Sequence, residues 1–143
     1  MAIRQISVFL ENKPGMLETM TEVLAAADID IRALSLAETK DFGIVRMIVS
    51  DVYETATVLK DNHFIASMTP VIAVKIDDKV GGLSNVLKTL SAASVNIEYM
   101  YASLAGKGGN ACMIFRVEDE KKAEAALRAG GFKLADQETV AEM

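Results

Sequence analysis

The sequence predicts an α+β fold made of two similar units, each with the element order β-α-β-β-α-β. An internal repeat covers nearly all of the 143 residues. Within each copy, apolar residues at every second position, typical of strands, give way to apolar residues three or four positions apart, typical of helices. These two observations divide the chain into predicted domains at residues 1–69 and 70–143.

The repeat is visible when the sequence is shifted against itself. Lys13–Leu17 falls on Lys79–Leu83 at a shift of 66 positions, and from Val45 onward the shift is 68. The extra two positions lie where Gly106–Asn110 lengthens a loop of the second copy. Loops accept such insertions, whereas strands and helices do not, so the pattern indicates a duplicated unit.

Each unit begins with a strand and a helix. Ile6–Leu10 places apolar residues at every second position, as in a half-buried strand, and Ile72–Ile76 repeats the pattern. The apolar positions of Met16–Ala27 follow one helical face, and those of Leu83–Leu90 repeat this stripe. Pro14 suits the first helical turn, where its missing N–H has no helical partner to lose.

The second part of each unit is predicted as two strands, a helix and a final strand. Asp51 and Asp119 are expected to cap the helices, and Gly130-Gly131 to end the last one. This order is the split βαβ, or ferredoxin-like, unit. The strands are Ile31–Leu36, Ile44–Ser50, Ile97–Leu104 and Cys112–Val117, the helices Val52–Asn62 and Glu120–Ala129, and the final strands begin at Phe64 and Phe132.

A unit of this size supplies one sheet with helices on a single face. The other face must meet water, another sheet or a ligand. The join around Met68-Thr69-Pro70 is too short to be a free linker. We therefore expect the two units to pack side by side as a pseudo-dimer.

Composition excludes several classes of protein. With 15 basic against 20 acidic side chains, the net charge of −5 argues against a nucleic-acid surface. One cysteine and one histidine exclude an intrachain disulfide and a His/Cys zinc site, and no acidic triplet has metal-ligand spacing. No apolar run is long enough for a membrane span. We expect a soluble, cytoplasmic protein that needs no cofactor and no metal.

Three features look chemical and have simpler explanations. Gly106–Ala111 fits a dinucleotide fingerprint, but it joins two strands where that motif precedes a helix, so a glycine-rich turn is favoured. His63 has no counterpart in the other half and suits an exposed helix end better than catalysis. Cys112 has no nearby base, which favours a buried, inert thiol. Because no catalytic constellation is visible, we predict that the protein is not an enzyme.

Two local patterns suit a binding site. Tyr99 and Tyr101 share one face of their strand and Met100 the other, which fits a pocket rim or ordinary packing equally well. Leu10–Leu17 leads from a strand to a helix N-terminus, where free N–H groups attract an anion and Gly15 allows close approach. The alternative is that this turn is merely capped by its asparagine and tightly packed.

The stretch Ile6–Leu36 resembles an ACT domain, a small regulatory module attached to many enzymes of amino-acid metabolism. The resemblance rests on the strand, the turn Glu11–Leu17, the amphipathic helix and the Asp-Ile start of the next strand. It is especially close to regulatory subunits of acetohydroxyacid synthase and to the effector domain of phosphoglycerate dehydrogenase. The second half matches more loosely, with Val80 in place of the proline. The chain as a whole resembles a stand-alone tandem ACT protein.

In that family, effector amino acids bind between paired domains, against the turn of one domain and the second strand of its neighbour. The resemblance therefore implies two sites across the interface. If the turns cross the interface, Asn12 shares the first site with Asn96, and Asp78 shares the second with Asp30. Two carboxylates close together resist joint ionisation. We therefore predict unequal sites, and we expect the second to be degenerate: empty, structural or selective for a cation. The first site comprises Leu10, Asn12, Pro14, Gly15, Met16, Asn96, Tyr99 and Met100, and the second Asp78, Gly81, Gly82 and Asp30.

The resemblance implies an amino-acid-binding regulatory protein that signals to a partner enzyme of amino-acid metabolism. We also expect a homo-oligomer, formed through sheet edges or faces. Two alternatives are kept: a docking module on the same scaffold without a small ligand, and, with less support, a small ferredoxin-like enzyme. A docking module would make Asn12 and Gly15 expendable, and an enzyme would need an acid, base or nucleophile in a cleft.

Overall fold

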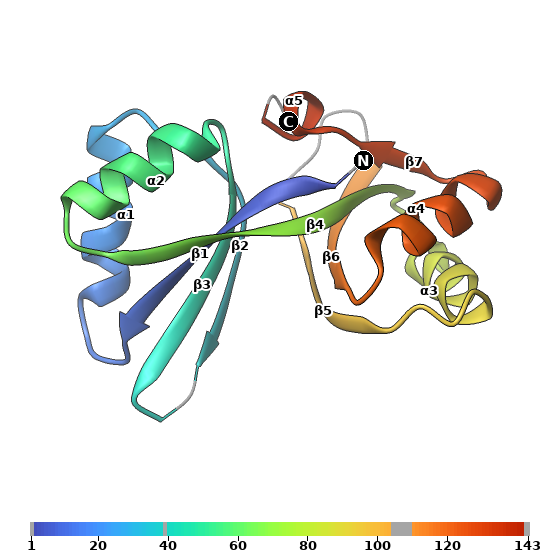
Figure 1. Cartoon of the computed structure of the whole chain (residues 1–143), viewed down its shortest axis with the longest axis horizontal. Helices are drawn as coiled ribbons and strands as arrows, with labels where there is room; N and C mark the ends of the chain where they lie inside the picture. Colours follow the sequence, from blue (N-terminus) through green and yellow to red (C-terminus); the bar gives the residue numbers. More distant parts are fainter. Residues whose placement is uncertain (1, 39, 104–109, 142–143) are drawn as a thin grey trace. The chain divides into compact units, whose positions relative to one another are not determined.

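The computed structural model describes residues 2–38, 40–103 and 110–141 (Figure 1). It divides into two compact units, Arg4–Thr69 and Pro70–Met143, the latter together with Met1–Ile3. Each unit has the order β-α-β-β-α-β, and β4 serves as the last strand of the first and the first strand of the second. The predicted α+β class with two ferredoxin-like units is therefore confirmed.

The first unit is an antiparallel sheet with two helices. Its strand order is β2-β3-β1-β4, and β1 pairs with β3 so that Val8 lies opposite Val45. The elements are β1 (Ile3–Glu11), α1 (Met16–Ala26), β2 (Ile31–Glu38), β3 (Phe42–Val49), α2 (Val52–Asp61) and the first part of β4 (Ile65–Asp77).

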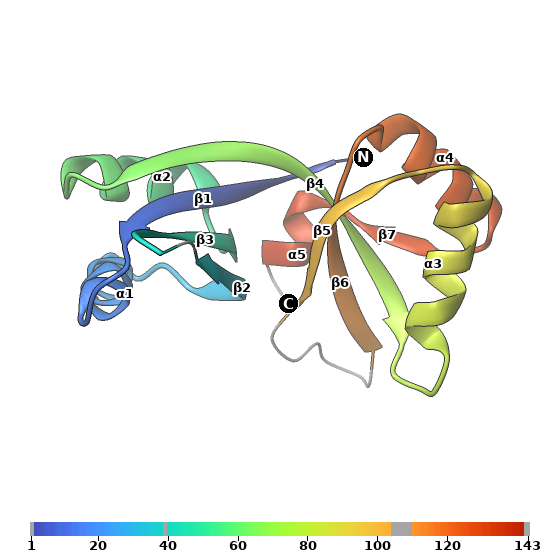
Figure 2. The same ribbon diagram turned by 90° about the horizontal axis from the view of Figure 1, so that it is seen from below.

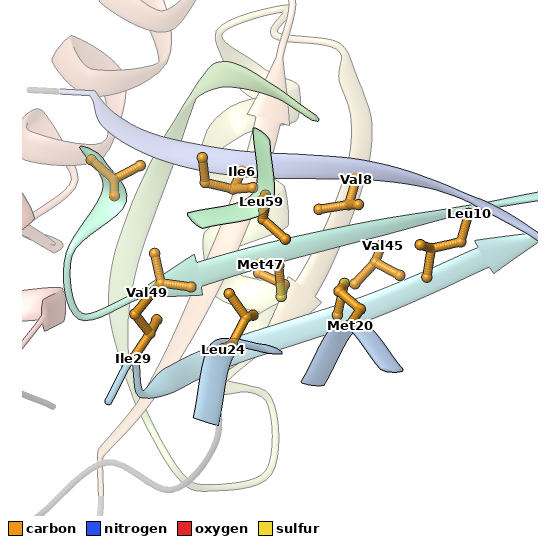
Figure 3. Close-up of a cluster of buried hydrophobic side chains, with 11 residues drawn as sticks. Ile6, Val8, Leu10, Met20, Leu24, Ile29, Val45, Met47, Val49 and Leu59 are labelled. Carbon is orange, nitrogen blue, oxygen red and sulfur yellow. The ribbon is translucent and has the colours of Figure 1, made fainter. Parts of the chain in front are cut away.

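The core of the first unit lies between this sheet and its helices. Figure 3 shows Met20 and Leu24 of α1 pointing toward Val45 and Met47 of β3, and all four are buried. Burial of these apolar side chains is the main force that holds the helices to the sheet. The remaining buried members are Ile6, Val8, Leu10, Ile29, Val49, Val52 and Leu59.

The second unit repeats this plan and adds one helix. Its strand order is β7-β4-β6-β5, and Phe115 of β6 is the largest fully buried side chain of its core. The unpredicted α5 lies on the other side of β6 from α3 and α4 (Figure 2) and buries Val140. The elements are the rest of β4, α3 (Gly82–Ala92), β5 (Ile97–Ala102), β6 (Asn110–Val117), α4 (Glu120–Ala129), β7 (Lys133–Ala135) and α5 (Gln137–Ala141).

The backbone confirms the repeat residue by residue. Gly15 and Gly81, 66 positions apart, have φ angles of 85° and 86°. Asp28 and Ser94, at the same shift, have φ angles of 58° and 56° after α1 and α3. His63 and Gly131, 68 positions apart, are also left-handed, at 66° and 83°. Because left-handed residues are uncommon outside glycine, three such pairs confirm both shifts.

The predicted helix caps are confirmed. Asp51 accepts the N–H of Glu54 at 3.0 Å, and Asp119 accepts the N–H of Lys122 at 3.1 Å. These bonds satisfy donors that a helix N-terminus otherwise leaves unpaired.

One local prediction was wrong and another was confirmed. Pro14 does not lie in the first helical turn, because Gly15 occupies the N-cap and α1 begins at Met16. The prediction that the join around Pro70 is not a free linker is confirmed, because β4 runs without interruption from Ile65 to Asp77 (Figure 1). The predicted turn over residues 106–109 and the strand end at Leu104 lie outside the described residues. No helix within the described ranges is both long and apolar enough to cross a membrane.

Candidate functional site

The turn of the first unit connects the end of β1 to the start of α1. Gly15 caps the helix in a left-handed conformation, and its carbonyl accepts the N–H of Thr19 at 3.0 Å. Lys13 N–H donates to the carbonyl of Glu11, also at 3.0 Å, and closes the turn. A Cβ on Gly15 would meet no atom within 4 Å. The helix N-terminus, where N–H groups carry partial positive charge, is therefore open to a ligand.

Asn12 ties this turn to the neighbouring hairpin. Its backbone N–H donates to the carbonyl of Asp41 at 2.9 Å, and its side-chain Nδ2 donates to the carbonyl of Lys40 at 3.4 Å. Asn12 therefore does hold the turn together, which is the structural role that the sequence left open as an alternative to ligand binding. Because these bonds use the donors of Asn12, they also orient its amide group at the exposed turn.

The other predicted residues of the turn divide into exposed and packed ones. Pro14 is exposed, as are Asn12 and Gly15. Leu10 is 4% exposed and belongs to the core, and Met16 is half-buried against it. The structure thus brings all five residues into one turn, with the polar and backbone groups facing solvent.

The second unit builds its turn with the same bonds. Gly81 is the left-handed N-cap, Asn85 N–H donates to its carbonyl at 3.0 Å, and Lys79 N–H donates to Asp77 at 2.9 Å. The residue before the cap is Val80, which is fully exposed.

Gly82 marks the main difference in backbone packing between the turns. A Cβ there would lie 2.5 Å from the carbonyl oxygen of Asp77, so the position excludes any side chain. The first unit carries Met16 at the equivalent position. Asp78, Gly81 and Gly82, all assigned to the second site, lie together in this turn, and Asp78 is exposed.

The two second-strand positions have matching backbone bonds. Ser50 N–H donates to the carbonyl of Asp30 at 2.9 Å, and Glu118 N–H donates to that of Asn96 at 3.2 Å. The carboxylate of Asp30 pairs with Arg32 at 3.1 Å. Sequence reasoning missed this arginine, although residues two positions apart on a strand share a face. Asp30 therefore brings a partly neutralised carboxylate to the second predicted site.

Asn96 is exposed at the start of β5, and it lines two cavities of about 450 and 520 Å³. Further along β5, Met100 packs against the core of the second unit, whereas Tyr101 is buried on the opposite side. Tyr99 is half-buried opposite Arg116. The methionine is thus a packing residue, and Tyr99 is the accessible aromatic side chain of this strand.

The remaining candidates have structural explanations. Burial raises the pKa of Cys112 to about 11, with Lys75 opposing the shift, so the thiol is protonated at neutral pH. His63 is exposed and ends α2 in a left-handed conformation. Within the described ranges, no group of three His, Cys, Asp or Glu residues could hold a metal ion.

The predicted site residues thus fall into separate groups inside each unit. One turn holds Leu10 to Met16, a second turn holds Asp78 to Gly82, and β5 carries Asn96 to Met100. The pairing of Asn12 with Asn96, and of Asp78 with Asp30, joins residues of different units and stays a prediction.

The strand-turn-helix of both units, on a duplicated ferredoxin-like fold, is that of a regulatory module. The chain belongs to the ACT domain pair family, whose model matches residues 1–143. The resemblance found in the sequence is thereby confirmed. No curated protein matches the chain.

Solved structures share the fold over most of the chain. Protein BT0572 from Bacteroides thetaiotaomicron has a TM-score of 0.93 at 39% identity, with 100% of this chain and 98% of that chain covered. The ligand-free regulatory subunit of aspartate kinase from Thermus thermophilus has a TM-score of 0.66 at 18% identity, covering 88% and 89%. The regulatory subunit of aspartate kinase from Thermus flavus has a TM-score of 0.64 at 18% identity, with 90% of each chain covered. At 18% identity, the likeness concerns the fold alone.

Proposed function

We propose that the protein is an amino-acid-binding regulatory protein whose effector binds at the interface between its two ACT units. The observation that carries the proposal is the open, left-handed Gly15 cap at the head of α1. It supplies a recognition element for a carboxylate, and it occurs in a chain of the ACT domain pair family. The protein has no catalytic activity of its own in this proposal.

The effector carboxylate binds the backbone N–H groups of Gly15 and Met16. The N–H of Met16 donates to the carbonyl of Lys13 at a long 3.4 Å, and the helix dipole favours a negative charge at this exposed position by about 0.3–1 kcal/mol. The ammonium group binds oxygen atoms of Asn12, whose side chain is held at the turn by its bond to Lys40, and of Asn96 from the other unit. Tyr99 borders the side chain of the effector.

The second site, with Asp78 and Asp30, is unequal to the first in this proposal. An effector carboxylate at the Gly81 cap would meet the carboxylate of Asp78, which repels it. Arg32 neutralises part of the charge of Asp30 and reduces, without removing, the acidic character of the site. The effector therefore occupies the Asn12 site first.

Signalling follows from linkage between effector binding and the arrangement of the two units. A ligand that touches both units stabilises the arrangement it binds best, and its differential affinity sets the strength of the signal. The receiver is a partner enzyme of amino-acid metabolism. We also propose a homo-oligomer, because β2 and β5 are edge strands of the sheet and an unpaired edge favours association.

A thermal-shift screen of the twenty amino acids tests the proposal. A ligand at a hundred times its Kd stabilises the folded protein by about 2.7 kcal/mol, which raises the midpoint by several degrees. Asn12→Ala should lose the shift, and the matched variant Asp78→Ala should keep it. Absence of a shift with every amino acid would instead support the docking module, for which this turn is expendable.

A further inference from the structure

The second unit contains a cavity of about 380 Å³ at the end of β4. It lies between the first turn of α3 and the loop from α4 to β7, and Phe132 forms part of its wall. Three lysines line it, Lys75, Lys79 and Lys133, against a single carboxylate, Asp77. A cavity of this size holds a small molecule, and its lining is strongly positive.

Two of these lysines face each other across the sheet. In the antiparallel register of β4 and β7, Lys75 lies directly opposite Lys133. Like charges in this position destabilise a sheet. Lys79 is paired with Asp77 at 3.5 Å, whereas the ion pairs of the described residues include neither Lys75 nor Lys133. Two positive charges therefore remain at the cavity.

Asp136, a further carboxylate of the second unit, is already engaged. Asp136 follows β7, and its side chain accepts the backbone N–H of Thr139 at 2.8 Å at the start of α5. That hydrogen bond is the main reason that the pKa of Asp136 is lowered, and Lys75 contributes less. Asp136 is not part of the cavity wall, so it leaves the lysine pair available to a ligand.

The remaining wall adds donors for an anion. Gly82 and Asn85 of α3 line the cavity, so the positive end of this helix faces the same space as the lysines. Gly82 itself is buried, and its N–H donates to the carbonyl of Lys79 at 3.1 Å. Asn85 can donate from its side-chain amide. The lysines and Asn85 thus line the cavity from β4, β7, α3 and the turn between β4 and α3.

The first unit shows that the fold does not require this lysine pair. Its residues at the equivalent positions are Phe9 and Ile65, 45% and 71% exposed, and Met16 stands in place of Gly82. Each replacement in the second unit adds positive charge or removes a side chain. Because the destabilising pair occurs in one copy of the repeat, it has a role there other than folding.

We propose that this cavity is a binding site for the phosphate group of a small molecule, separate from the effector site at the Asn12 turn. A phosphate dianion matches the charges of Lys75 and Lys133, and its oxygens can accept a hydrogen bond from the side-chain amide of Asn85. The site lies wholly within the second unit and does not depend on the Asn12 site. It shares Gly82 with the second predicted effector turn, where three lysines of the cavity offset the carboxylates of Asp77 and Asp78.

The test is a titration of the ¹⁵N-labelled protein with inorganic phosphate at constant ionic strength, followed by NMR. The amides of Gly81–Leu83 should shift and saturate, while the equivalent amides of Gly15–Leu17 should not. The double variant Lys75→Gln/Lys133→Gln should weaken binding about tenfold or more. The control Lys121→Gln/Lys122→Gln, which removes the same charge from exposed positions of α4, should bind normally.

The double variant also has a readout without phosphate. Removing the opposed charges should leave its unfolding midpoint unchanged or raised, which shows that it folds. Shifts that do not saturate, that occur equally at both turns, or that are weakened equally by the control would overturn the proposal. Equal saturation by acetate would overturn the assignment to phosphate.

Discussion

The two units share a backbone and differ in the side chains at the ends of their sheets. Three left-handed positions recur at the same places, and the turns close with the same hydrogen bonds. At the sheet ends, however, Phe9 and Ile65 in the first unit are replaced by Lys75 and Lys133 in the second. The comparison teaches that the repeated positions specify the fold, whereas the positions that diverge give the two units different charge at their sheet ends.

The largest effect is expected from matched core substitutions. Leu24 and Leu90 are equivalent leucines, each 1% exposed. Leu24→Ala and Leu90→Ala should each lower the free energy of unfolding by about 3 kcal/mol, because each removes buried surface and leaves a cavity. Urea denaturation measures both, with the exposed Glu22→Ala and Lys88→Ala as controls near zero. A loss below about 1 kcal/mol in either leucine variant would contradict an equivalent core.

The next effect is a loss of stability at high pH, which comes from the buried Cys112 of the second unit. The pKa of Cys112 is about 11, above its ordinary value of 9.0, because burial disfavours the thiolate. Above pH 9 the thiol ionises in the unfolded chain before it ionises in the folded protein. The free energy of unfolding is therefore at its full value below pH 9 and falls as the pH rises toward 11. Between these limits the wild type should lose about 2 kcal/mol more than Cys112→Val. Equal pH profiles for the two proteins would show that the thiol ionises freely.

A smaller effect tests the shared turn. Gly15→Ala and Gly81→Ala should each cost about 1 kcal/mol, because alanine is strained in a left-handed conformation. The strain is purely backbone, since a Cβ at either position meets no atom within 4 Å. Gly15→Asn and Gly81→Asn are the matched controls, because asparagine tolerates this conformation better. If alanine and asparagine cost the same in denaturation, the φ angles of the turns are not those described.

The smallest effect concerns the helix caps. Asp51→Ala and Asp119→Ala should each lower the unfolding free energy by about 1 kcal/mol through loss of the N-cap hydrogen bond. The variants Asp51→Asn and Asp119→Asn should retain most of it. A cost confined to one unit would show that the caps, unlike the cores, are not equivalent.

The elements were predictable because each rests on a local pattern. Strand alternation, helical stripes and the capping aspartates act over a few residues, and the repeat supplied a second copy of each. The sequence excluded a free linker at the join but did not reveal that one strand runs through it, because a proline such as Pro70 usually interrupts a strand. The carbonyl of Pro70 accepts a hydrogen bond from Arg116 at 2.9 Å within the second unit.

The sequence did not reveal the residues whose proximity depends on the register of strand pairing. Lys75 and Lys133 lie 58 positions apart, and the pairing of β4 with β7 brings them together. The helix α5 was missed because five residues show little periodicity, although Asp136 with Thr139 is a capping pattern. The turn residues of the candidate site were predictable, since a single local segment contains them.

The central claim is that the first turn, rather than the second, receives the effector. Crystals grown with the amino acid that gives the largest thermal shift test this most directly. The account predicts density for its carboxylate at the N–H groups of Gly15 and Met16, beside Asn12. Density confined to Asp78 and Asp30 would contradict it.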